Sequence, residues 1–134
     1  MDVTMKRLGE AELEIMIAIW HSHKPVTSNY ILEQIQGRRK WVLSTLMTSL
    51  TRLATKGFVY CDRTTRINMY SALITEDDYK TMESSSLLEK LYNNSLHSFV
   101  KSLYSSNSIS DSDLLELRKF LEYIEQKKRG SYND

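Results

Sequence analysis

The chain has 134 residues, 41% hydrophobic and 26% charged, and its single cysteine, Cys61, excludes an internal disulfide framework or a multi-cysteine metal site. No apolar run is long enough to span a membrane and Met1–Leu8 lacks the apolar segment of a signal peptide, so we expect a cytoplasmic protein without membrane insertion. The formal net charge is only +1, but the segment Lys24–Arg66 carries eight basic and two acidic side chains, which favours an anionic partner.

Three amphipathic helices are predicted in the first half of the chain. Apolar residues recur every three or four positions over Leu8–Trp20, which is the spacing of a helix with one buried face. Thr27 can cap a second helix over Ser28–Gln36. A third helix is predicted over Leu43–Lys56, where leucines form the apolar stripe and Gly57 favours termination.

Two short strands follow the third helix. The runs Phe58–Arg63 and Asn68–Leu73 are rich in aromatic and β-branched residues, and Thr64–Ile67 between them has the character of a hairpin tip. The order of three helices and then a hairpin with a basic tip is that of a winged helix. We therefore predict a winged helix-turn-helix in this part of the chain.

Helical patterning returns after residue 74. A capped start at residues 75–78 leads into helical spacing that continues to Tyr92. A break rich in Ser and Asn separates this region from a last helix, where Ser110 and Asp113 have the spacing of a capping box. The last helix has apolar residues at heptad a and d positions: Leu114, Leu117, Leu121, Ile124. Because two heptads are too short to associate alone, we expect this helix to pack with the two preceding ones.

The third helix has the side chains expected of a major-groove reading element. Its leucine stripe lies opposite small hydroxyl residues and one arginine, a combination that allows close approach and contacts to base edges or phosphates. The predicted base-reading residues are Ser44, Thr45, Thr48, Arg52. An amphipathic helix with a solvated polar face would show the same pattern. The hairpin and the clustered positive charge favour DNA binding over that alternative.

The remaining cations of the basic segment are interpreted as phosphate contacts, together with two hydroxyl residues at a helix N-terminus. This set is Thr27, Ser28, Arg38, Arg39, Lys40, Lys56, Arg63, Arg66. Each group has an alternative structural role. Thr27 and Ser28 can serve only to cap a helix, and the wing arginines can serve only to keep a hairpin edge soluble.

Signals for catalysis or metal binding are weak. His21 and His23 form a His-x-His pair near a helix end, without carboxylate or cysteine companions at ligand spacing. We find no glycine-rich phosphate loop, no paired catalytic carboxylates and no nucleophile motif. We therefore expect no enzymatic activity, no cofactor and no bound metal. Cys61 falls in a strand pattern and is interpreted as a half-buried small side chain.

Several segments resemble the penicillinase repressor family of bacterial regulators, the BlaI/MecI/CopY group. The most specific match is Trp41–Leu53 followed by Lys56-Gly57-Phe58-Val59, where threonines, leucines, Thr-Arg-Leu and Lys-Gly recur at the family's intervals. The other matching segments are Leu8–Met16 with Trp20, Ile31–Ile35, Tyr70-Ser71, Leu87–Tyr92, Ser98–Val100 and Glu116–Arg118. Together they cover most of the chain.

The resemblance implies a fold that is mostly α with a small β-hairpin, a winged helix-turn-helix followed by a three-helix dimerisation domain. We place the DNA-binding domain at residues 1–74, the dimerisation domain at 75–128 and a disordered tail at 129–134. A homodimer is expected to bind inverted-repeat operators in double-stranded DNA and to repress antibiotic-resistance genes such as those for β-lactamases. The expected dimerisation residues are Leu88, Leu91, Phe99, Leu103, Leu114, Leu117, Leu121, Ile124.

The family also implies a route of derepression, in which a membrane sensor of β-lactams leads to proteolysis of the dimerisation domain. The family's cleaved bond joins Asn to Phe, whereas this chain has no Asn-Phe pair and aligns Ser102-Leu103 with that position. The copper-responsive branch carries Cys-x-Cys motifs that the segment 126–134 lacks. The inducer therefore stays open, as does the alternative of a winged helix that binds a protein and not DNA.

Overall fold

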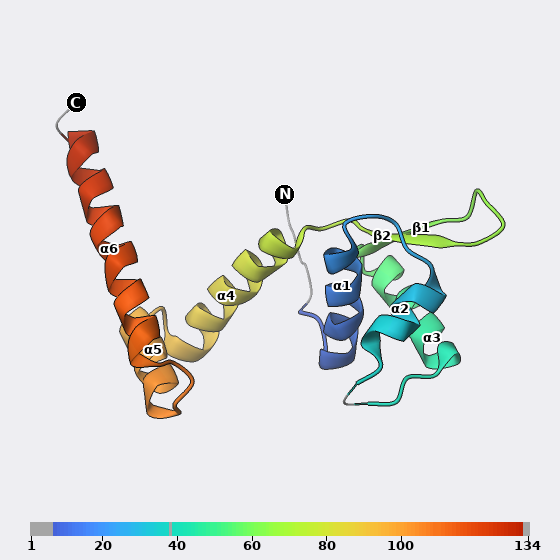
Figure 1. The fold of residues 1–134 in the computed structure, drawn as a ribbon, viewed down its shortest axis with the longest axis horizontal. Helices are drawn as coiled ribbons and strands as arrows, with labels where there is room; N and C mark the ends of the chain where they lie inside the picture. The colour runs from blue at the N-terminus through green and yellow to red at the C-terminus, as the bar shows by residue number, and fades with distance from the viewer. Residues whose placement is uncertain (1–6, 38, 133–134) are drawn as a thin grey trace. The chain divides into compact units, whose positions relative to one another are not determined.

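The computed structural model describes residues 7–37 and 39–132 (Figure 1). The chain divides into two compact units, Met1–Ser84 and Ser85–Asp134. The first unit extends ten residues beyond the boundary expected at residue 74, and the reason is Tyr79, which is buried in the core of the first unit. The two units are described separately below.

The first unit has the predicted winged-helix element order, and the mostly helical fold class is confirmed. It contains α1 (Glu10–Ser22), α2 (Ser28–Ile35), α3 (Leu43–Thr55), β1 (Val59–Asp62) and β2 (Met69–Ala72), followed by the start of α4 (Glu76–Tyr92). The Thr27 hydroxyl accepts a hydrogen bond from the backbone N–H of Tyr30 and caps α2, as predicted.

The hairpin is antiparallel and pairs Val59 with Ala72 and Asp62 with Met69. A single bridge adds a third segment to it, because Val26 N donates to Tyr70 O at 2.9 Å and Tyr70 N donates to Val26 O at 2.7 Å. This bridge was not predicted, since one residue after Pro25 has no strand pattern. It ties the wing to the loop that precedes α2.

The core of the first unit is formed by leucine, isoleucine and aromatic side chains from all of its elements, and Tyr79 of α4 closes it. The Tyr79 hydroxyl accepts a hydrogen bond from the backbone N–H of Leu8 at 2.9 Å and donates one to Glu83 at 3.2 Å. Its ring lies 5.8 Å from that of Trp20 and 6.0 Å from that of Phe58, centroid to centroid. The start of α4 is thus part of the winged-helix unit.

Replacing Tyr79 with phenylalanine is expected to lower the free energy of unfolding by about 1–3 kcal/mol, because the buried N–H of Leu8 loses its acceptor. Denaturant unfolding measures the change. Tyr60→Phe is the control, since Tyr60 is exposed and loses the same atom. Equal stability of the two variants would contradict this account of the core.

The second unit contains the rest of α4, α5 (Leu96–Ser105) and α6 (Asp111–Tyr132). The predicted capping box begins α6: Ser110 N donates to Asp113 Oδ2 at 2.7 Å and Asp113 N donates to Ser110 Oγ at 3.1 Å. The prediction of a disordered tail from residue 129 onward is wrong for residues 129–132, which continue α6. The reason is that Lys127, Lys128 and Arg129 suit the last turns of a helix, where cations offset the negative end of its dipole.

The second unit lacks a core of its own. Not one side chain described between residues 85 and 131 is buried. Large apolar side chains are instead exposed along its helices, and they include Leu91, Leu96, Tyr104, Leu115, Leu117, Phe120, Leu121 and Tyr123. Among the described residues, no helix is long and apolar enough to cross a membrane.

Candidate nucleic-acid interface

The outer face of α3 is the centre of the candidate interface. Leu46, Leu50 and Leu53 are buried on the inner face of this helix. The four predicted base-reading residues, Ser44, Thr45, Thr48 and Arg52, are all exposed. In the described part of the chain, Arg52 makes no ion pair, so its guanidinium is available to a ligand.

Threonine hydroxyls along this face donate to the helix backbone. Thr48 Oγ1 donates to Ser44 O at 3.1 Å, and Thr51 Oγ1 donates to Met47 O at 3.0 Å. Thr55 repeats the arrangement with Thr51 O at 3.0 Å. Because each proton is used within the helix, these side chains offer their methyl groups and oxygen lone pairs to an approaching molecule.

Apolar side chains stand at the start of the same helix. Val42 is 50% exposed and Leu43 is 46% exposed, although both have branched aliphatic side chains. Val42 and Leu43 are not among the predicted base-reading residues, and neither are Thr51 and Thr55. The signal that could have identified Val42 and Leu43 is their position outside the leucine stripe at the N-terminal end of α3. In helix-turn-helix proteins, residues at this end of the recognition helix contact base edges.

Two predicted phosphate contacts are already held by carboxylates of α1. The ammonium of Lys56 lies 2.8 Å from Glu12 Oε2 and 2.9 Å from Glu12 Oε1. The guanidinium Nε of Arg39 lies 3.0 Å from Glu14 Oε2. Their role as phosphate contacts stays a prediction, and a phosphate would have to compete with these carboxylates.

The wing presents cations at its tip. Arg63 and Arg66 are both exposed in the turn between β1 and β2. The one carboxylate beside them, Asp62, accepts hydrogen bonds from the Thr64 hydroxyl at 2.7 Å and from the Thr64 N–H at 2.9 Å. These two bonds lower the pKa of Asp62 and fix the turn.

The remaining predicted phosphate contacts precede α3 in the chain. Lys40 is exposed in the loop before α3, and Ser28 is partly exposed in the first turn of α2. Thr27 is the N-cap of α2, as the alternative interpretation expected. Arg38 lies outside the described residues.

The model of the penicillinase repressor family matches residues 8–123. This chain belongs to the penicillinase repressor family. It is 30% identical over 123 residues to the penicillinase repressor of Bacillus licheniformis, covering 92% of this chain and 95% of that protein. It is 33% identical over 121 residues to the methicillin resistance regulatory protein MecI of Mammaliicoccus sciuri, covering 90% and 98%.

Solved structures of family members also match. The solution structure of Bacillus licheniformis BlaI, in its monomeric form and in complex with the blaP half-operator, shares 29% identity. The match covers 57% of this chain and 92% of that one, with a TM-score of 0.48. The match of the family model to residues 8–123 confirms the resemblance to the penicillinase repressor family that was predicted from sequence motifs.

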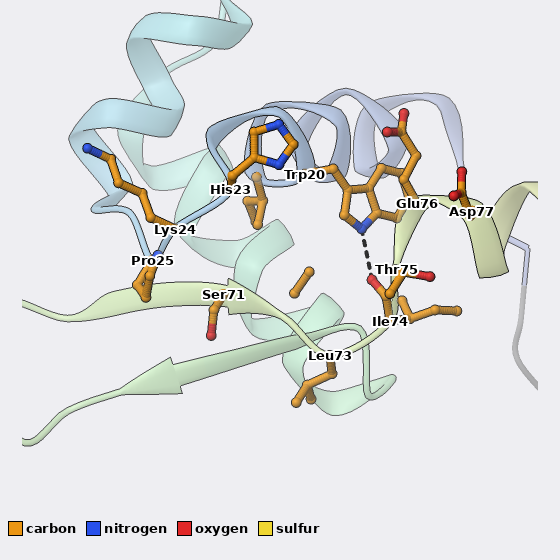
Figure 2. A pocket seen from close by; sticks show the side chains of 12 residues that line it. Trp20, His23, Lys24, Pro25, Ser71, Leu73, Ile74, Thr75, Glu76 and Asp77 are labelled. Atoms are coloured by element: carbon orange, nitrogen blue, oxygen red, sulfur yellow. Dashed lines mark hydrogen bonds between the residues drawn. The ribbon is translucent and has the colours of Figure 1, made fainter.

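In this family member, a cleft of 520 Å³ lies beside Trp20, between the end of α1 and the segment that joins β2 to α4 (Figure 2). Trp20 Nε1 donates to Ile74 O at 2.9 Å across its floor. Basic His23 and Lys24 line the cleft together with acidic Glu76 and Asp77. Side chains of both charge signs therefore border the cleft.

His21 and His23, the histidines considered for metal binding, lie at the end of α1, whereas Cys61 lines a pocket together with Thr51 and Thr55 of α3. His21 lies 3.6 Å from a Glu76 carboxylate oxygen, and His23 is the left-handed residue that ends α1. Across residues 7–37 and 39–132, no cluster of three or more His, Cys, Asp or Glu side chains could hold a metal ion. Cys61 is half-buried in β1, opposite Tyr70 of β2.

Proposed function

We propose that this protein is a homodimeric transcriptional repressor that binds an inverted-repeat operator, with α3 of each copy in a major groove. The observation that carries the proposal is the outer face of α3, which exposes hydroxyl residues and Arg52, an arginine without an ion pair to any described residue. Exposed cations of the preceding loop and of the wing come before and after this helix in the chain. The half-operator complex of a relative with 29% identity supports the same function.

Phosphate contacts are assigned to the exposed groups that flank α3. Lys40 of the loop before α3 and Arg63 and Arg66 of the wing after it supply exposed positive charge. Thr27 and Ser28 add the N-terminus of α2, whose backbone N–H groups favour an anion. These contacts place the helix and add salt-dependent affinity, while α3 supplies the sequence preference.

Dimerisation is assigned to the second unit. A three-helix segment with no buried side chain in its described part needs a partner to cover its apolar residues. The eight dimerisation residues expected from the sequence are all exposed or only partly buried. A second copy of the chain is the natural partner, because an inverted repeat in DNA matches the two-fold symmetry of a dimer.

Antibiotic-resistance genes are the proposed targets, because the relatives are named as penicillinase and methicillin resistance regulators. Derepression is proposed to follow proteolysis of the second unit after a membrane sensor detects a β-lactam. The candidate cleavage region, Ser102 and Leu103, lies within α5, so that helix must open locally before a protease can bind it. A soluble cytoplasmic location follows from this function.

The chemistry of α3 predicts a preference for thymine. The methyl groups of its threonines, with exposed Val42 and Leu43, match the thymine C5-methyl, which is the apolar group of the major groove. Replacing the thymines of an operator with deoxyuracil removes only this methyl. We expect an affinity loss of about fourfold for each contacted methyl group, measured by competition binding. Unchanged affinity would contradict this role of the apolar groups.

Footprinting of the DNA upstream of the protein's own gene tests the proposed function. Two protected half-sites are expected, separated by about 10 base pairs or a multiple of it, because two recognition helices of a dimer enter successive major grooves on one face. A single protected half-site would contradict the dimeric mode. Absence of protection at low salt would contradict DNA binding and favour the protein-interaction alternative.

A further inference from the structure

Glu12 joins α1 to the end of α3. Both of its carboxylate oxygens bind the ammonium of Lys56, at 2.9 and 2.8 Å, although the two residues are 44 positions apart in sequence. Gly9 N also donates to Glu12 Oε1 at 3.2 Å. The side chains are only 14% and 31% exposed for Glu12 and Lys56, so this pair is better shielded from water than the other ion pairs of the chain's described part.

Glu14 holds the segment that leads into α3. Its Oε1 accepts a hydrogen bond from the indole N–H of buried Trp41 at 3.4 Å, and its Oε2 pairs with Arg39 at 3.0 Å. The Arg39 guanidinium also lies over the Trp41 ring, 5.8 Å from its centroid. The side-chain amide of Gln36 forms two hydrogen bonds with the backbone of Trp41: its Nε2 donates to the carbonyl, and its Oε1 accepts from the N–H.

We infer that Glu12 and Glu14 are positioning residues, which fix the two ends of the recognition helix α3 on α1 through Lys56 and through Arg39 with Trp41. This inference rests on the proposed function and deepens it. Lys56 and Arg39 then orient the reading helix, and Lys40, Arg63 and Arg66 are the cations that contact phosphates.

The pairing of Glu12 with Lys56 also affects the charge that the first unit presents to DNA. A carboxylate on a DNA-binding unit repels the phosphate backbone, unless a cation neutralises it. Partial burial raises the pKa of Glu12, but the hydrogen bonds from Lys56 and Gly9 and the positive charge of Lys56 and Arg52 outweigh it, so this pKa lies below its usual value. Glu12 is therefore ionised at neutral pH, and Lys56 balances the charge of this side chain, which is only 14% exposed.

The test compares Glu12→Gln, Lys56→Met and their double variant with the full-length wild type. Each is titrated in salt against the footprinted operator duplex and a scrambled duplex. Glu10→Gln is the matched control, because it removes a carboxylate from the same helix turn and Glu10 has no ion pair with a described residue. Lys56→Arg keeps the cation and should retain the discrimination of the wild type.

We expect Glu12→Gln and Lys56→Met each to lower the ratio of operator affinity to scrambled-duplex affinity roughly fivefold. The double variant keeps the net charge of the wild type, so it should be no less selective than the less selective single variant and should keep the wild-type salt slope. The inference is overturned if Glu12→Gln discriminates between the two duplexes as well as Glu10→Gln does. It is also overturned if Lys56→Met weakens both duplexes equally and reduces the salt slope by about 0.9, as loss of a phosphate contact would.

Failure of the proposed function has a different signature. A wild type that binds the two duplexes equally would remove the sequence-specific role of α3, whatever the variants do. A wild type that discriminates between them, combined with an unaffected Glu12→Gln, would remove only the positioning role. Circular dichroism of each variant confirms that the fold is retained before binding is compared.

Discussion

Replacing Leu117 and Leu121 with aspartate is expected to dissociate the dimer and to reduce operator affinity by about 10²–10⁴-fold. These leucines are 38% and 48% exposed in the single chain and lie on one face of α6, at heptad spacing. A carboxylate at such a position would be buried against a second copy without a partner, which disfavours association strongly. The second half-site would then no longer contribute to binding.

Sedimentation measures the oligomeric state of this variant, and anisotropy with full and half operators measures its affinity. Gln126→Asp is the control, because it introduces one aspartate on the opposite side of α6 and should leave both measurements unchanged. The variant's affinity for a half operator should also equal that of the wild type. A variant that stays dimeric, or a monomer that binds the full operator as tightly as before, would contradict the dimer proposed here.

Arg52→Ala is expected to cost about 1–3 kcal/mol of operator binding and to relax the sequence preference at one position of each half-site. The guanidinium is exposed in the second half of α3 and has no ion pair in the described part of the chain, so its donors are available to a guanine edge. Binding to a panel of operators with single base changes identifies the affected position.

Lys40→Ala is the comparison for Arg52→Ala, because Lys40 is proposed to contact phosphate only. It should weaken binding to all duplexes of the panel by a similar factor and reduce the salt slope by about 0.9. If both variants lost affinity uniformly across the panel, the division into reading and positioning residues would be wrong.

Local patterns were sufficient to predict most elements of the fold. The three- to four-residue spacing of Leu46, Leu50 and Leu53 fixed the buried face of α3, and the Ser110 to Asp113 spacing located the start of α6. The family resemblance followed from the same local segments. Such features are readable because each depends on residues within one or two helical turns of each other.

Features that depend on distant residues were not predicted. The bridge of Val26 to Tyr70, the burial of Tyr79 against Trp20 and the pairing of Glu12 with Lys56 all join segments tens of residues apart. Lys56 was therefore predicted to contact phosphate from its charge alone. The residues near it in the sequence do not indicate that it pairs with a carboxylate of α1. Because Tyr79 is buried in the first unit, this unit ends at Ser84 and not at residue 74, where the sequence predicted its boundary.

Sequence-selective DNA binding is the central claim, and fluorescence anisotropy tests it most directly. A labelled duplex from upstream of the protein's own gene is titrated beside a scrambled duplex of the same composition, over a series of salt concentrations. We predict tight binding to the upstream duplex, much weaker binding to the scrambled one, and affinity that falls steeply with salt. Equal binding to both duplexes, or no binding even at low salt, would contradict it.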